Sequence, residues 1–152
     1  GAEMARGRNA EAEDALKQAL DQDVNTHYAS EAALRLGDLS LAKKNAEDAE
    51  TYFRIASDKG GAEDGGAVRA RAFFGLGRAA ELGGFDEDAS RYYMSVAILY
   101  DHDELVPESL FRAALAFDRL KRQEDRLKAV EELAERYPQS VWAGKVDETW
   151  QN

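Results

Sequence analysis

The stretch from Pro107 to Ala143 constrains the fold more than any other part of the chain. Apolar residues recur in it every three or four positions, in two runs that a short polar turn separates. These apolar positions are Leu110, Ala113, Ala114, Phe117 and Leu120, and then Leu127, Val130, Leu133, Ala134 and Tyr137. The spacing predicts two amphipathic helices, each with one buried stripe. Two helices cannot cover that much apolar surface, so the pair requires neighbours of the same kind.

The rest of the chain supplies such neighbours. Helical periodicity recurs over residues 9–20, 26–43, 46–57, 67–82 and 86–99, and again after Ser140. The composition, rich in Ala, Leu, Glu, Asp and Arg with only two prolines, favours helix nearly throughout. No segment alternates β-branched or aromatic residues with polar ones, as a half-buried strand would. The sequence therefore predicts an all-α protein.

Residues 58–66 are the main irregularity, because they contain four glycines among acidic residues. This composition predicts a flexible surface loop. A phosphate-cradling loop is the alternative, but it would follow a strand and end in Lys-Ser or Lys-Thr. Neither feature is present, and the acidic residues would repel phosphate.

The charge and the cysteine count exclude several classes of function. The net charge of −10 argues against binding to nucleic acid or to anionic lipid. The absence of cysteine removes thiol catalysis and cysteine-ligated zinc. No run of about 18 apolar residues occurs, so we expect no membrane insertion by this segment. The opening residues GAEMARGR look like a truncated edge, which suggests a fragment of a longer protein.

Candidate catalytic residues are few. His27 and His102 lie in different connections, and no Ser has the surroundings of a nucleophile. The acidic cluster at 101–104 lacks the spaced ligands and central Gly of a calcium loop, so we expect a solvated turn in which Asp103 caps a helix. Asp86 and Ser140 are further predicted caps. We expect no catalytic, cofactor or metal site, and hence no enzyme.

The three hairpins share one pattern of spacing. In each, a small residue of the first helix is followed by three residues of the second helix, 12, 16 and 19 positions later. After Gly37 they are Ala49, Phe53 and Ala56; after Gly77, Ala89, Tyr93 and Val96; after Ala114, Arg126, Val130 and Leu133. Small residues allow helices to cross closely. We expect the residues at the second of these spacings to fill the gaps between adjacent hairpins.

This pattern resembles the tetratricopeptide repeat, a helix–turn–helix unit of about 34 residues with a small residue at its eighth place, Ala at its twentieth and Pro near its end. The resemblance implies a right-handed α-solenoid formed by one array over residues 1–152. Its parts are half a repeat in 1–24, repeats in 25–66, 67–103 and 104–139, and a terminal helix in 140–152. Arg126 departs from the pattern, since Ala is usual there. The alternative is a helical bundle with coincidental spacings, which three hairpins with identical spacings argue against.

The segment RYPQSVWA is similar to the Tyr-Pro-x-Ser-x-x-Ala endings of repeats in bacterial cell-envelope proteins. This similarity implies a parent protein in the periplasm or the cell envelope.

The resemblance also implies a binding surface, because the first helices of such hairpins line a concave groove. The frame places nine residues there: Arg35, Asp38, Arg71, Phe74, Arg78, Phe111, Arg112, Leu115 and Arg119. Guanidinium groups bind carboxylates with paired hydrogen bonds, and Phe adds apolar contact. We therefore expect a non-enzymatic scaffold that binds a protein or peptide with acidic groups or a free carboxylate.

Two alternatives remain at this point. The arginines can instead pair with neighbours such as Glu31, Glu81, Glu108 and Asp118 and simply solvate the face. The chain can also be a structural spacer that self-associates, with its repeat ends stacked on other copies.

Overall fold

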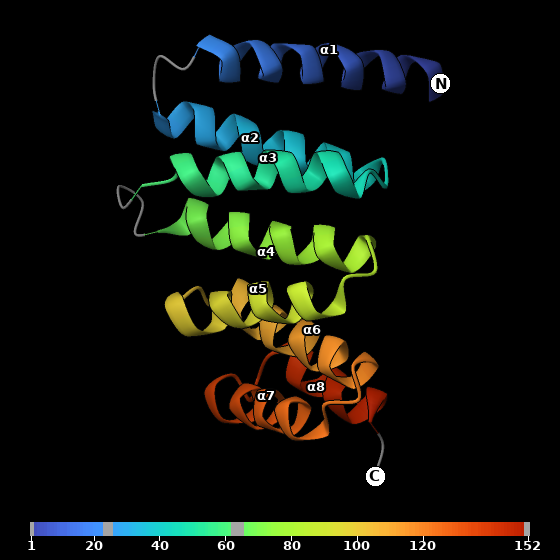
Figure 1. The fold of residues 1–152 in the computed structure, drawn as a ribbon, viewed down its shortest axis with the longest axis vertical. Coiled ribbons are helices and arrows are strands. Elements are labelled where there is room, and N and C mark those ends of the chain that lie inside the picture. Colours follow the sequence, from blue (N-terminus) through green and yellow to red (C-terminus); the bar gives the residue numbers. More distant parts are fainter. Residues whose placement is uncertain (1, 23–25, 62–65, 151–152) are drawn as a thin grey trace.

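The computed structural model describes residues 2–22, 26–61 and 66–150, with side chains for all of these except 2–9, 12 and 26. Every regular element in these ranges is an α-helix, which confirms the predicted all-α class. The helices are α1 (Ala2–Gln22), α2 (Thr26–Ala42), α3 (Ala46–Lys59), α4 (Ala67–Leu82), α5 (Asp86–Leu99), α6 (Leu105–Arg119), α7 (Gln123–Arg136) and α8 (Val141–Thr149). They stack along one long axis, from α1 at one end to α7 and α8 at the other (Figure 1).

The helices form two unequal layers. The first layer consists of α2, α4, α6 and α8, and each of these helices packs directly on the next. The second layer consists of α3, α5 and α7, and each of these helices packs on the first-layer helices beside it. Within the described residues, no close backbone contact joins α3 to α5 or α5 to α7. The second layer is therefore spread apart, whereas the first layer is closed.

The turns inside the three hairpins have the same geometry. A residue with positive φ lies two positions after the first helix of each hairpin: Lys44 (59°), Gly84 (83°) and Lys121 (60°). The amide of the following residue donates a hydrogen bond of 2.8 or 2.9 Å to a carbonyl five residues back. This arrangement is the Schellman motif, which satisfies carbonyls at the end of a helix. The three positive-φ residues each lie seven positions after the small residue of their hairpin, so the repeated spacing has a structural counterpart.

Phe53 holds neighbouring hairpins together. Its ring lies between α2 and α4, where both helices carry glycine. A Cβ on Gly37 would lie 2.6 Å from this ring, and a Cβ on Gly75 would lie 2.4 Å from it. Tyr93 repeats the arrangement one hairpin later, since a Cβ on Gly77 would lie 2.6 Å from its ring. The predicted close crossings at Gly37 and Gly77 are therefore confirmed, and Gly75 adds a contact between hairpins that the sequence pattern did not reveal.

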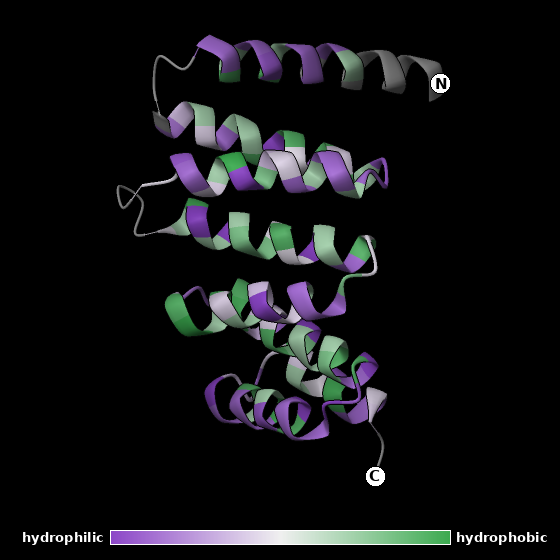
Figure 2. Cartoon of the chain, viewed as in Figure 1, coloured by the Kyte–Doolittle hydropathy of each residue, from purple (hydrophilic) through white to green (hydrophobic). Residues whose placement is uncertain are grey.

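The predicted stripe of α7 is partly wrong. Leu133 is buried as expected, but Leu127 is 49% exposed and Ala134 is exposed, whereas Ala129 is buried. Two overlapping sets of positions satisfy helical spacing here, and packing on α6 selects the one that contains Ala129 and Leu133. Figure 2 shows the consequence: α6 is mostly hydrophobic in colour and α7 mostly hydrophilic.

Two of the three predicted caps are wrong. Ser140 accepts a hydrogen bond from the first turn of α8, as expected. Asp86 is already inside α5, and no side chain caps that helix. Asp103 does not cap α6 either: Glu104 holds the N-cap position without a side-chain cap, and His102 Nδ1 accepts a 3.2 Å hydrogen bond from the Leu105 amide.

The glycine-rich stretch predicted as a loop is only partly described. α3 continues to Lys59, two residues beyond its expected end, and residues 62–65 lie outside the described ranges.

We expect Gly75→Ala to destabilise the fold by about 1–2 kcal/mol, because overpacking against the Phe53 ring outweighs the gain in helix propensity. Gly144→Ala is the matched control, since a Cβ there meets nothing within 4 Å and should stabilise α8 slightly. Urea unfolding followed by circular dichroism measures both. Equal stability of the Gly75 variant and the wild type would contradict the role given to this contact.

We expect Lys121→Gly to stabilise the fold by about 0.5–1 kcal/mol, because glycine adopts the left-handed conformation without the strain that Lys121 bears. Lys128→Gly, at an exposed position inside α7, should instead destabilise it by about 1 kcal/mol. Thermal unfolding midpoints of the two variants should therefore move in opposite directions.

Candidate functional site

Four of the nine predicted binding residues meet at one place on the first layer. Asp38 of α2 and Arg71, Phe74 and Arg78 of α4 line a cavity of about 120 Å³. Apolar residues and a glycine complete its lining: Leu34, Leu41, Phe53, Gly75 and Leu105. The cavity lies next to the Phe53 contact. Gly75, which makes room for this ring, has no side chain to fill the surface of α4 there. We call it the inner pocket.

The charges of the inner pocket are mixed. Burial raises the pKa of the Asp38 carboxyl, and the nearby Arg71 and Arg78 guanidinium groups lower it in part. Arg71 makes one long ion pair of 3.6 Å with Glu31. Arg78 is half-buried and forms no ion pair with any other described residue. A cation beside an apolar wall with no such partner is the most distinctive chemical feature of this surface.

Arg112, in contrast, is part of the structure. Its side chain is 21% exposed, and its Nε donates a 2.7 Å hydrogen bond to Glu108. A second ion pair of 3.4 Å joins it to Glu81 of α4, and its guanidinium lies 6.0 Å from the Phe74 ring centroid. Burial lowers the pKa of this guanidinium, but the hydrogen bond with Glu108 and the surrounding charges raise it overall.

The same network includes a residue that the sequence did not suggest. The buried Tyr93 hydroxyl donates a 2.5 Å hydrogen bond to Glu81. Burial raises the pKa of the Tyr93 phenol, and the charge of Glu81 raises it further. Glu81 therefore connects α4 to both α5 and α6. Its separation from Tyr93 and Arg112 along the chain hides this role from any local pattern.

Three other predicted residues do not belong to an open groove. Phe111 is only 7% exposed, because its ring packs against Trp142 of α8 and Trp150 just after that helix, at 5.5 and 6.0 Å between centroids. Arg119 donates a 2.7 Å hydrogen bond to Asp86 at the start of α5. Leu115 is half-buried against the same core as Phe111. In the structure, packing thus occupies Phe111 and Leu115, and an ion pair with Asp86 occupies Arg119.

Arg35 keeps an exposed position on α2 and forms no ion pair with another described residue, but it does not line the inner pocket. The alternative role of the arginines as paired surface charges therefore applies to Arg112 and Arg119, more loosely to Arg71, and neither to Arg35 nor to Arg78.

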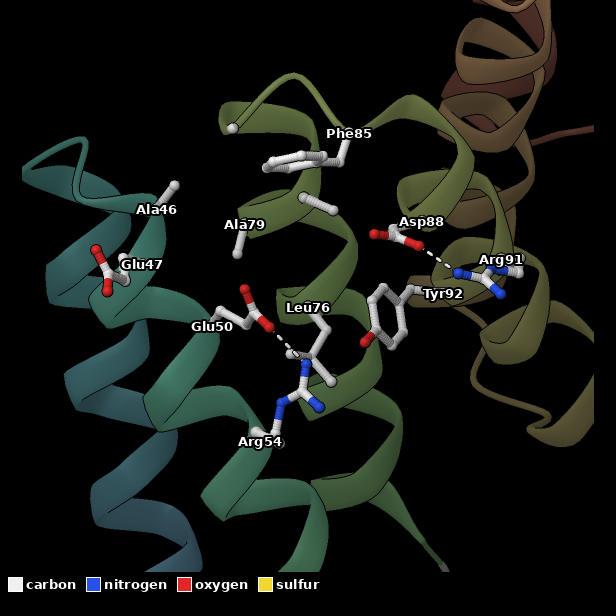
Figure 3. A pocket seen from close by; sticks show the side chains of 12 residues that line it. Ala46, Glu47, Glu50, Arg54, Leu76, Ala79, Phe85, Asp88, Arg91 and Tyr92 are labelled. Atoms are coloured by element: carbon white, nitrogen blue, oxygen red, sulfur yellow. Dashed lines mark hydrogen bonds and ion pairs between the residues drawn. The ribbon is translucent and has the colours of Figure 1, made fainter.

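A larger cavity lies on the opposite face, where the sequence predicted nothing. It has a volume of about 550 Å³ and lies between α3 and α5, with α4 as its floor (Figure 3). Phe85 lies in the turn between α4 and α5, at the edge of this cavity, and is 64% exposed. In the sequence, the one signal for this cavity was an aromatic residue directly after Gly83-Gly84, because a ring in a turn is rarely buried. We call this cavity the outer groove.

Two further features of the described residues bear on function. None of their His, Asp and Glu residues gather in groups of three or more that could hold a metal ion. None of the described helices combines the length and the apolar character needed to cross a membrane.

Comparison with known proteins identifies no relative: no protein-family model matches the chain, and no curated protein sequence matches it. The function must therefore be inferred from the geometry of the surfaces themselves.

We expect the free energy of unfolding to fall above pH 10, because an unfolded tyrosine releases its proton near that value while folded Tyr93 keeps it. The stability that this proton provides is complete below pH 10 and is lost above it, by about 1.4 kcal/mol per pH unit. Tyr93→Phe should flatten this alkaline decline. Urea unfolding at a series of alkaline pH values measures the slopes; equal slopes in the variant and the wild type would refute the assignment.

Proposed function

We propose that the chain is a right-handed solenoid of tetratricopeptide-type repeats that acts as a non-enzymatic protein-interaction module. The identical turns at Lys44, Gly84 and Lys121 support the repeat, since they recur with the same spacing as the small residues. The two unequal layers support the solenoid, because a stack whose first layer is closed and whose second layer is spread must curve toward the first. The inner pocket then lies on the concave side.

The proposed ligand is a peptide with an acidic side chain or a free C-terminal carboxylate. Arg78 carries this proposal, because it is a half-buried guanidinium that no described residue pairs with. Guanidinium groups bind carboxylates through two parallel hydrogen bonds. Arg71, which is only loosely paired, lies in the same pocket, and Phe74 offers apolar contact beside both.

The size of the inner pocket favours a peptide over a small-molecule substrate. A volume of about 120 Å³ accommodates one side chain or one chain end, whereas ligand pockets of enzymes usually hold about 300–1,000 Å³. The remaining affinity would come from the exposed surface of α2 and α4 around the pocket. Arg35 lies on that surface and would contact residues of the peptide further along.

We expect a short labelled peptide of Asp, Glu and Phe with a free C-terminus to bind the protein in a fluorescence-anisotropy titration. Arg78→Glu should weaken this binding by about tenfold or more, because it removes a charge-assisted pair and adds repulsion. Lys128→Glu makes the same change of charge at an exposed site on α7 and should change the affinity by less than about twofold.

A substitution that removes a negative charge from the same pocket gives a second control. Asp38→Asn removes the only carboxylate among the described residues that line the inner pocket and should tighten binding by about two- to fivefold. Equal weakening by the Arg78 and Lys128 variants would show that only net charge matters, and the assignment would fail. Light scattering of the same samples separates this function from the self-association alternative, which requires oligomers that grow with protein concentration.

A further inference from the structure

The outer groove exists because of how the second layer is spaced. α3 and α5 both pack on α4, but no close backbone contact joins them to each other within the described residues. α4 forms the floor between them: Leu76 and Ala79 lie buried beneath it, Ala80 is half-buried, and Gly83, just after α4, is exposed. Such a floor offers contact to the aliphatic part of a side chain and no hydrogen bonds from side chains.

The walls of the outer groove carry carboxylates that point into it. Figure 3 shows Glu50 of α3 and Asp88 of α5 reaching toward the floor from opposite sides. Glu50 binds Arg54 through Oε1, and Asp88 binds Arg91 through Oδ1. No hydrogen bond or ion pair to a described residue occupies the second oxygen of either carboxylate. Each therefore keeps an acceptor for a ligand in the groove.

The surrounding charge has the same sign. α3 and α5 each carry two more acidic than basic side chains, whereas α4 carries three arginines and one glutamate. Glu47 adds a further carboxylate to the lining and is in no ion pair with another described residue. Arg54 and Arg91 are exposed, and each already pairs with an acidic residue of its own helix. The groove thus favours a cation.

Two aromatic rings add to this preference. Phe85 projects over the groove from the turn before α5, and Tyr92 forms part of the α5 wall (Figure 3). The face of an aromatic ring attracts Lys and Arg side chains. An exposed ring next to carboxylates and an apolar floor matches the two parts of such a side chain, its aliphatic stem and its charged head.

We propose that the outer groove binds a short basic segment of a partner protein. A Lys or Arg side chain of the segment enters between Glu50 and Asp88 and lies beneath the Phe85 ring, with its stem on Ala80 and Gly83. This surface is separate from the inner pocket and has the opposite charge preference, so the protein would hold two partners at once, one on each face of the stack.

The test uses a short labelled peptide of Lys, Leu and Ser with both ends capped, and the same peptide with Glu in place of Lys. We expect only the Lys peptide to bind in an anisotropy titration, and more weakly as the salt concentration rises. The double variant Glu50→Gln, Asp88→Asn should weaken binding by about tenfold, because two exposed ion pairs are lost. Phe85→Ser should weaken it by about threefold through the lost ring contact.

Matched variants on α7 separate the site from general attraction to an acidic protein. Glu131→Gln, Glu135→Gln makes the same change of charge at exposed residues, and Leu127→Ser removes an exposed apolar side chain. Both should change the affinity by less than about twofold. Phe85→Ser should also leave α5 intact, since Ser favours the position before a helix.

The proposal is overturned if the Lys peptide does not bind, if the Glu peptide binds equally well, or if the α7 variants weaken binding as much as the groove variants. Arg78→Glu should leave Lys-peptide binding within about twofold, because the inner pocket lies on the other face of α4. Failure of the wild-type protein to bind the acidic peptide would therefore reject the proposed function without touching this inference.

Discussion

The close approach of α2 and α4 around the Phe53 ring is the contact on which the rest of the structure depends. Gly37 and Gly75 leave no room for a side chain there, so both helices touch the ring directly. Gly77 and Tyr93 repeat the contact one hairpin later. These contacts draw α2 and α4 together, whereas α3 and α5 stay apart. The same packing therefore leaves a small inner pocket on one face and a wide outer groove on the other.

The distribution of charge follows the same division. α4 concentrates arginines, and its neighbours α3 and α5 are acidic. Some arginines hold hairpins together: Arg112 joins α6 to Glu81 of α4, and Arg119 joins α6 to the start of α5. Arg78 has no such role among the described residues, so its guanidinium stays free beside the inner pocket. A protein that is acidic overall can therefore present a cationic pocket on one face.

The hairpins could be predicted because their signals are local. Helical periodicity, paired with small residues at constant spacing, indicated each helix and its close crossing. The sequence patterns failed where two sets of neighbouring residues fitted the same pattern equally well. On α7 the face that contains Leu127 and the face that contains Ala129 both have helical spacing, and only contact with α6 selects between them. Near α6, Asp103 was the predicted cap, but the loop geometry brings His102 to the Leu105 amide instead.

The sequence by itself determined the helices, the turns between them and the positions of the small residues, because these depend on residues a few positions apart. Only the tertiary structure decided which side chains remain available for binding. Glu81 lies 31 residues before Arg112, and Asp86 lies 33 residues before Arg119. Trp142 of α8 and Trp150 just after it cover Phe111 from beyond the third hairpin. Whether a side chain remains available for binding depends on partners from other hairpins that folding brings next to it. Helical periodicity, which relates residues a few positions apart, cannot predict these partners.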